Sequence, residues 1–99
     1  MSDQLKPWVI VSSIGDDASE QDIERIRPNI ISLVDEWQSS KGTMWSGSFS
    51  GQPSGMAVFE ATEQDAKKFY QDYSDACENV LVHHMYQWDA MPILSVLSK

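Results

Sequence analysis

The sequence has little cysteine, few basic residues and no long apolar run, and each of these shortages excludes a class of protein. The single cysteine, Cys77, cannot form a disulfide within the chain, which is typical of a reducing compartment. No stretch approaches the ~20 consecutive apolar residues of a membrane-spanning helix, and residues 1–7 lack the apolar segment of a signal peptide. We therefore expect a cytoplasmic protein that does not span a membrane.

The shortage of positive charge bears on possible partners. Seven Lys and Arg residues are outnumbered by fifteen Asp and Glu residues, which gives a net charge of −8. Nucleic acids are bound largely by Lys and Arg side chains that neutralise phosphates, and anionic membranes attract the same residues. We expect neither partner, and we interpret the acidic charge mainly as a source of solubility.

Large apolar side chains are abundant for a chain of this length. The 99 residues include four Trp, three Phe, three Tyr and five Met. They fit a single domain spanning residues 1–99, and so small a domain buries only roughly 60–70 % of its unfolded surface. Aromatic residues and Met are enriched at protein interfaces, so this composition predicts a homodimer.

The first predicted element is a strand over residues 8–14, a β-branched run that ends at a Gly-Asp-Asp turn. Both of its alternating sides begin apolar, with Trp8 and Ile10 on one side and Val9 and Val11 on the other. Such a strand is usually central and covered on both sides. A lone chain of this size cannot cover both sides, so the strand also predicts a partner subunit.

A helix is predicted next, with Asp17 or Ser19 as its N-cap and Gly42 as its C-cap. Pro28 lies inside it and predicts a kink or a short break, because proline removes one hydrogen bond and crowds the preceding turn. The apolar side chains at helical spacing are Ile23, Ile26, Ile30, Leu33, Val34 and Trp37.

The rest of the chain completes a β-α-β-β-α-β order. Strands are predicted over residues 43–49 and 56–61, a helix from Thr62 with Asp65 as its capping-box partner, and a strand over residues 81–89. This order predicts a ferredoxin-like α+β fold, in which two helices cover one face of a four-stranded antiparallel sheet. The expected core spans residues 8–89, and residues 90–99 are expected to form a tail or an extra strand.

Short motifs follow one another along most of the chain, from about residue 8 to residue 88. They are Arg27-Pro28 in the first helix, Lys41-Gly42 before Gly47 and Ser48-Phe49, Gly55 at the start of the third strand, Asp65-Ala66 in the second helix, and Asp72. In this order and spacing the chain resembles the YCII-like proteins, which belong to the dimeric α+β barrels together with muconolactone isomerases and antibiotic-biosynthesis monooxygenases. The resemblance implies a homodimer whose two sheets face each other, with a cleft in each subunit between sheet and helices.

The chain departs from that family at its proposed catalytic pair. The family places a histidine shortly after the Arg-Pro pair, whereas this chain has Asn29 and Ile30 there. It also places an Asp-Pro pair in the second helix, whereas Tyr73 follows Asp72 here. The resemblance therefore carries over Asp72 alone.

His83 and His84 are the only histidines and are adjacent in a predicted strand, so their side chains should point to opposite faces. One interpretation is a partly buried histidine beside an interface histidine. The other is that one of them acts as a general base in a cleft, oriented by Asp72 or Asp89. Their divergence prevents both from binding one metal ion, and three or four converging ligands are needed for a site, so we expect no metal.

Aromatic side chains suggest a possible ligand pocket. Trp45, Tyr86 and Trp88 either fill a dimer core or line a pocket for a small apolar or planar molecule, oriented by polar groups. The polar candidates are Ser46, Ser48 and His84, with Arg27 as a further candidate.

Two further features argue against other chemistry. Cys77 has acidic neighbours in the sequence, which disfavour a thiolate, so we expect a packed core residue rather than a nucleophile. No Gly-rich loop leads into a helix to receive a phosphate, and we expect no cofactor.

Three hypotheses for function remain open. The first is a dimeric binding protein for a small organic ligand. The second is a cofactor-free enzyme acting by proton transfer, with His84 or His83 as base and Asp72 as its partner. The third is a protein-interaction module that uses the aromatic face.

Overall fold

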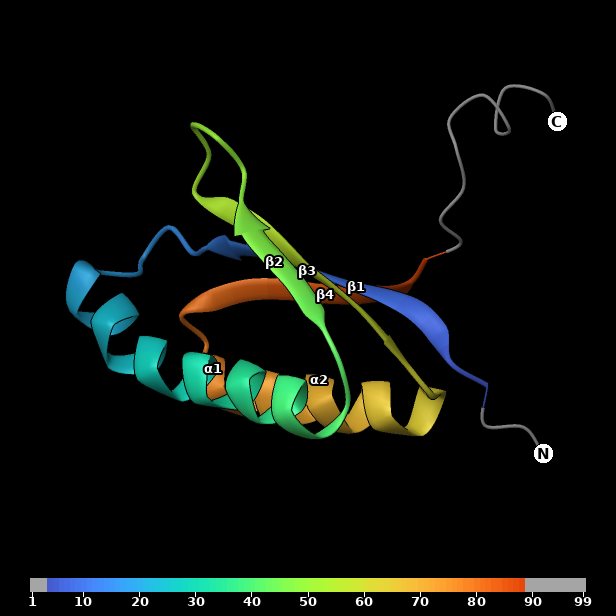
Figure 1. Cartoon of the computed structure of the whole chain (residues 1–99). Coiled ribbons are helices and arrows are strands. Elements are labelled where there is room, and N and C mark those ends of the chain that lie inside the picture. Colours follow the sequence, from blue (N-terminus) through green and yellow to red (C-terminus); the bar gives the residue numbers. More distant parts are fainter. Residues whose placement is uncertain (1–3, 89–99) are drawn as a thin grey trace, which may run out of the picture.

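The computed structural model of the protein describes residues 4–88 and has the predicted element order. The elements are β1 (Lys6–Ile14), α1 (Glu20–Ser40), β2 (Met44–Ser48), β3 (Ser54–Ala61), α2 (Glu63–Cys77) and β4 (Leu81–Gln87). The four strands form one antiparallel sheet in the order β2-β3-β1-β4, and both helices lie on the same face of it (Figure 1). This is the ferredoxin-like fold, as predicted.

β1 is a central strand of the sheet, flanked by β3 and β4, which confirms the expectation from its two apolar sides. Trp8 and Ile10 are buried on the side that faces the helices. Val9 and Val11 alternate with them, so they lie on the opposite side, where they are half-buried. The strand therefore divides its apolar side chains between a covered face and an uncovered one.

Ser19 is the N-cap of α1, one of the two caps expected. Its side chain accepts from the backbone N–H of Asp22 at 3.1 Å, and the Asp22 carboxylate accepts from the Ser19 N–H at 3.1 Å, which completes a capping box. The helix then continues without interruption through Pro28, so a break there is wrong, and the alternative of a kink stays a prediction. Proline removes only one hydrogen bond, and the buried residues Ile26 and Trp37 anchor the helix on either side of it.

The N-terminus of α2 differs from the expected capping box. The Thr62 hydroxyl accepts from the Asp65 N–H at 3.1 Å, so Thr62 is the cap. The Asp65 carboxylate does not return the bond but accepts from Lys41 Nζ at 3.2 Å. A charged partner competes well with a backbone amide for a carboxylate, so Asp65 connects the two helices.

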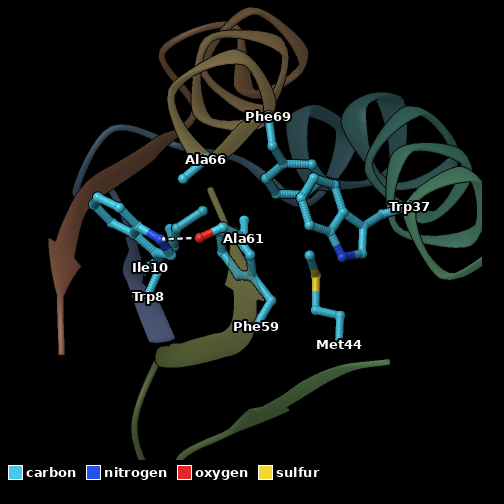
Figure 2. Packing of buried hydrophobic residues seen from close by; sticks show 8 residues of the cluster. All are labelled: Trp8, Ile10, Trp37, Met44, Phe59, Ala61, Ala66 and Phe69. Carbon is cyan, nitrogen blue, oxygen red and sulfur yellow. Dashed lines mark hydrogen bonds between the residues drawn. The ribbon is translucent and has the colours of Figure 1, made fainter. Parts of the chain in front are cut away.

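The core lies between the sheet and the helices and is largely aromatic. Figure 2 shows Trp37 of α1 and Phe69 of α2 converging on Phe59 of β3. The ring of Trp37 meets each of the other two edge to face, with centroids 5.2 Å apart in both cases. On the other side of the cluster, Trp8 Nε1 donates to the carbonyl oxygen of Ala61 at 3.0 Å, which satisfies a buried polar group at the end of β3.

At Gly55, the backbone of β3 lies so close to that of β2 that a side chain would clash with it. A Cβ added there would collide with the carbonyl oxygen of Gly47 and lie 3.1 Å from Ser48 Cα. A Cβ at Gly47, which precedes the residue of β2 that pairs with Gly55, would meet nothing within 4 Å. A side chain is therefore excluded at Gly55 and has room at Gly47, so the two positions can be compared.

We expect Gly55→Ala to lower the free energy of unfolding by about 1–3 kcal/mol, because backbone atoms of β2 must move to admit the methyl group. Gly47→Ala should change it by less than about 0.5 kcal/mol. Urea denaturation followed by circular dichroism measures both. Equal losses in the two variants would contradict the close packing of β2 on β3.

The two ends of the sequence lie outside the described residues. β4 ends at Gln87, and the N–H of Trp88 donates to the Pro7 carbonyl at 2.9 Å. Asp89 and the tail or extra strand expected over residues 90–99 belong to the undescribed part of the chain. Within residues 4–88, neither helix combines the length and apolar character needed to cross a membrane.

Candidate functional site

The face of the sheet that carries no helix, here called the open face, is mostly apolar. It is defined by the side chains that alternate with the helix-facing ones in the four strands. These are Trp45 of β2; Ser54, Met56, Val58 and Glu60 of β3; Pro7, Val9, Val11 and Ser13 of β1; and Val82, His84 and Tyr86 of β4. Glu60, near one end of β3, is the only acidic residue among them, although the chain as a whole carries fifteen.

Trp45 is the most exposed large apolar residue of this face. It lies on the edge strand β2, opposite Val58, and 74 % of its surface is accessible. Trp37, in the core beneath the sheet, is only 7 % accessible. An indole left in water is unfavourable by roughly 25 cal/mol for each Å² of apolar surface, so Trp45 marks a surface that would gain from being covered.

A hollow of about 420 Å³ opens beside Trp45, within the size range of small-molecule sites. It forms because β3 runs past β2: Met44, the first residue of β2, pairs with Phe59, which leaves Glu60 and Ala61 without a neighbour in β2. Its lining residues are Leu5, Trp37, Lys41, Gly42, Thr43, Trp45, Val58, Phe59, Glu60, Ala61 and Asp65.

The segment that follows α1 forms one wall of this hollow. Lys41 is the C-cap of α1, so the expectation that Gly42 caps this helix is wrong by one residue; the N–H of Lys41 donates to the Trp37 carbonyl at 2.7 Å. Gly42 follows with φ of +151°, a value that other residues rarely adopt. The turn it permits carries the chain from the helix layer into β2, so that Trp45 is placed at the rim of the hollow.

Three charged side chains line the hollow, and two of them neutralise each other. Lys41 Nζ lies 3.2 Å from Asp65 Oδ2, and both side chains are about half exposed. Glu60 has no ion-pair partner among residues 4–88. The hollow therefore combines an apolar, aromatic wall with one excess negative charge.

His83 belongs to a second group of polar side chains, on the helix-facing side of β4. Its Nδ1 lies 2.8 Å from the Tyr70 hydroxyl, which itself donates to the His83 carbonyl at 3.1 Å. The tautomer of His83 decides which of the two atoms donates in the hydrogen bond between Nδ1 and the hydroxyl. Tyr73 completes the group with a 2.6 Å hydrogen bond to Ser12 and an edge-to-face contact with the imidazole.

Burial disfavours the charged forms of Tyr73, Cys77 and His83. It raises the pKa of Tyr73 to about 12 and that of Cys77 to about 11, so neither ionises readily. Burial also lowers the pKa of His83, and the neighbouring His84 adds to the effect. Cys77 is buried at the end of α2, as expected for a packed core residue.

The lowered pKa of His83 predicts a specific dependence of stability on pH. The folded state disfavours the imidazolium, so its contribution is present above the ordinary pKa of about 6.5 and is lost as the pH falls through the lower, folded-state value. We expect the free energy of unfolding to decline more steeply between about pH 7.5 and pH 5 in the wild type than in His83→Gln. Urea denaturation across this range tests it, and parallel pH profiles would contradict it.

Asp72 lies apart from both histidines. Its carboxylate accepts from Lys68 Nζ at 3.1 Å, one helical turn away on α2. It lines a hollow of about 230 Å³ between the helices, which also includes Leu33, Glu36 and Phe69. His84 is on the open face, with its ring 6.3 Å from that of Tyr86, so the sheet separates it from Asp72.

The aromatic and polar candidates for a pocket are distributed over the sheet. Trp45 is on the edge strand β2, whereas Tyr86 is on the opposite edge strand β4, with β3 and β1 between them. Trp88 follows β4 and is partly exposed. Ser46 and Ser48 alternate with Trp45 and point to the other side of β2, and Arg27 is an exposed residue of α1.

The hollow thus retains Trp45 from the predicted pocket and adds residues that the sequence did not single out for it. Lys41 follows α1, whereas Glu60 is in β3 and Asp65 is in α2, and Lys41 and Asp65 are 24 positions apart. The sequence marked Lys41-Gly42 and Asp65-Ala66 as motifs, but it did not assign them to a pocket. Within residues 4–88 there is no cluster of three side chains suited to holding a metal ion.

Comparison with known proteins does not identify a family for this chain. No protein-family model matches the chain, and no curated protein matches its sequence. Among solved structures the chain is similar to a dimeric ferredoxin-like protein of unknown function from Thermobifida fusca YX. The sequence identity is 12 % and the TM-score is 0.42, over 84 % of this chain and 92 % of that one.

Proposed function

We propose that this chain is a homodimeric binding protein for a small organic ligand, and that the hollow beside Trp45 is its binding site. The observation that carries the proposal is the position of Trp45. Its indole is 74 % accessible and borders a hollow of about 420 Å³ whose wall includes Leu5, Val58 and Phe59. An apolar or aromatic ligand placed there would cover surface that is otherwise in contact with water.

The open face supports the homodimer. Two copies of a chain with net charge −8 repel each other, so a stable contact requires a surface from which acidic residues are absent. The open face meets this requirement except at Glu60, and it presents Val9, Val11, Met56 and Tyr86. Depletion of charge together with aromatic residues and Met is typical of the centre of an interface.

The two parts of the proposal are compatible. Trp45 belongs to an edge strand, and the hollow lies where β3 extends beyond β2. A second copy placed on the open face would therefore leave the hollow at the margin of the contact. This arrangement agrees with the resemblance to YCII-like dimeric α+β barrels, which stays a prediction, as does the cytoplasmic location.

The enzymatic alternative has less support. The Nδ1 of its candidate base His83 is hydrogen-bonded to the Tyr70 hydroxyl, and Asp72 is paired with Lys68. His84 lies on the opposite side of the sheet from Asp72, so these groups could not exchange a proton directly.

Chemical-shift mapping with small aromatic probes tests the binding site. Benzyl alcohol, benzyltrimethylammonium and phenylacetate would be titrated separately into ¹⁵N-labelled protein. We expect at least one of them to shift the indole N–H signal of Trp45 while the amide signals of Ile23 and Ile26, near the other end of α1, stay in place. Trp45→Leu, followed by the backbone amide signals of Thr43 and Val58 in the lining, should weaken the binding of that probe at least about tenfold, because it removes the aromatic wall.

The matched control is Phe49→Leu, which replaces another exposed aromatic residue outside the lining of the hollow. It should leave the affinity unchanged. If none of the three probes shifts Trp45, or if both variants lose affinity equally, the assignment of the site is wrong.

A further inference from the structure

We propose that the ligand of this hollow is an organic cation, an ammonium group carried on an apolar body. This inference rests on the proposed function and specifies the chemistry of the same site. It follows from one juxtaposition: the indole of Trp45 and the carboxylate of Glu60 line the same hollow, whose single basic side chain, Lys41, is already paired.

The lining of the hollow carries one negative charge that is not compensated within it. Lys41 Nζ and Asp65 Oδ2 are 3.2 Å apart, so the positive charge of Lys41 is matched within the wall. Glu60 is left without a partner among the described residues. A positively charged ligand would supply the missing partner, whereas a neutral ligand would cover the carboxylate without compensating it.

The aromatic wall that Trp45 provides also favours a cation. The face of an indole carries partial negative charge and attracts cations, Trp being the most effective of the aromatic side chains. Ammonium groups on apolar bodies are recognised in this way because the ring offers both an apolar surface and an electrostatic attraction. Trp45 is exposed enough to present its ring to a ligand.

The charges around the hollow disfavour an anionic ligand. An anionic ligand would have to separate Lys41 from Asp65 and would remain close to Glu60. It would also approach a protein whose net charge is −8, which slows association of anions and favours that of cations. The order of affinity that we expect is cation, then neutral compound, then anion.

Three probes of the same shape separate the effect of charge from that of size. They are choline, its uncharged carbon analogue 3,3-dimethylbutan-1-ol, and the anion 3,3-dimethylbutanoate. Titrated into the full-length protein and followed by the Trp45 indole N–H signal, choline should bind at least about tenfold more tightly than the alcohol. The carboxylate should bind more weakly than the alcohol.

Two variants identify the source of the selectivity. Glu60→Gln keeps the shape of the side chain and should reduce the choline preference about threefold or more, with little change for the alcohol. Glu36→Gln removes a carboxylate of α1 that does not line this hollow and should leave the preference intact. Circular dichroism confirms that both variants are folded.

The outcomes distinguish this inference from the function on which it rests. If the hollow binds the alcohol as tightly as choline, or if Glu60→Gln and Glu36→Gln behave alike, the cation assignment is overturned and the binding site stands. If no probe of this series or of the benzyl series shifts Trp45, both proposals fail together.

Discussion

Replacing Trp37 by alanine is expected to lower the free energy of unfolding by about 3–5 kcal/mol, a large part of the stability of a small domain. Trp37 packs α1 against both the sheet and α2. Its ring meets Phe59 of β3 and Phe69 of α2 edge to face, with centroid distances of 5.2 Å. Its removal would leave a cavity beside Phe59 and Phe69. Urea denaturation followed by circular dichroism measures the loss.

Trp45→Ala is the matched control, because it makes the same chemical change at a tryptophan that is 74 % accessible instead of 7 %. It should alter the free energy of unfolding by less than about 1 kcal/mol. If the two variants lose similar amounts, the roles given to the two tryptophans are wrong, and with them the placement of α1 against the sheet.

Introducing aspartate at Val11 is expected to convert the proposed dimer into monomers, raising the dissociation constant at least about 100-fold. Val11 lies on the central strand β1, on the open face, between Met56 and His84 of the neighbouring strands. A carboxylate there would be buried against the partner without a counter-ion. Sedimentation velocity at micromolar concentrations measures the change in mass.

Ser32→Asp adds the same charge to an exposed position of α1, away from the open face, and should leave the dimer intact. Circular dichroism establishes that Val11→Asp still folds, which its half-buried position allows. A wild-type protein that is monomeric at micromolar concentration, or a Val11→Asp variant that stays dimeric, would exclude the open face as the interface between copies.

The fold could be predicted because its signals are local. The alternation of Trp8, Val9, Ile10 and Val11 identifies a central strand, and short polar residues such as Thr62 identify helix starts. The opposite orientation of His83 and His84 follows from the geometry of a strand alone. Such signals depend on neighbours in sequence, which the sequence displays directly.

Two local expectations failed for reasons that lie in tertiary structure. The break at Pro28 did not occur, since the packing of Ile26 and Trp37 outweighs the loss of one hydrogen bond. The capping-box bond expected from Asp65 is replaced by its pairing with Lys41, which the fold brings close from the end of the other helix.

The candidate site was less predictable because it depends on register. The hollow exists since β2 begins at Met44, opposite Phe59, two residues short of the end of β3. Neither strand on its own indicates this offset. Likewise the partners of His83, which are Tyr70 and Tyr73, come from a helix whose rotation about its axis is set by the core.

The hydrogen bond from Trp8 to Ala61 has a consequence for the thermodynamics of binding. It fastens the last carbonyl of β3, at 3.0 Å, in the segment that projects past β2. The part of the hollow that Ala61 forms is therefore ordered before a ligand binds, so binding does not carry the entropic cost of ordering it. Trp8→Phe, which keeps an aromatic ring but removes the donor to this carbonyl, should make the entropy of association less favourable while its enthalpy changes little.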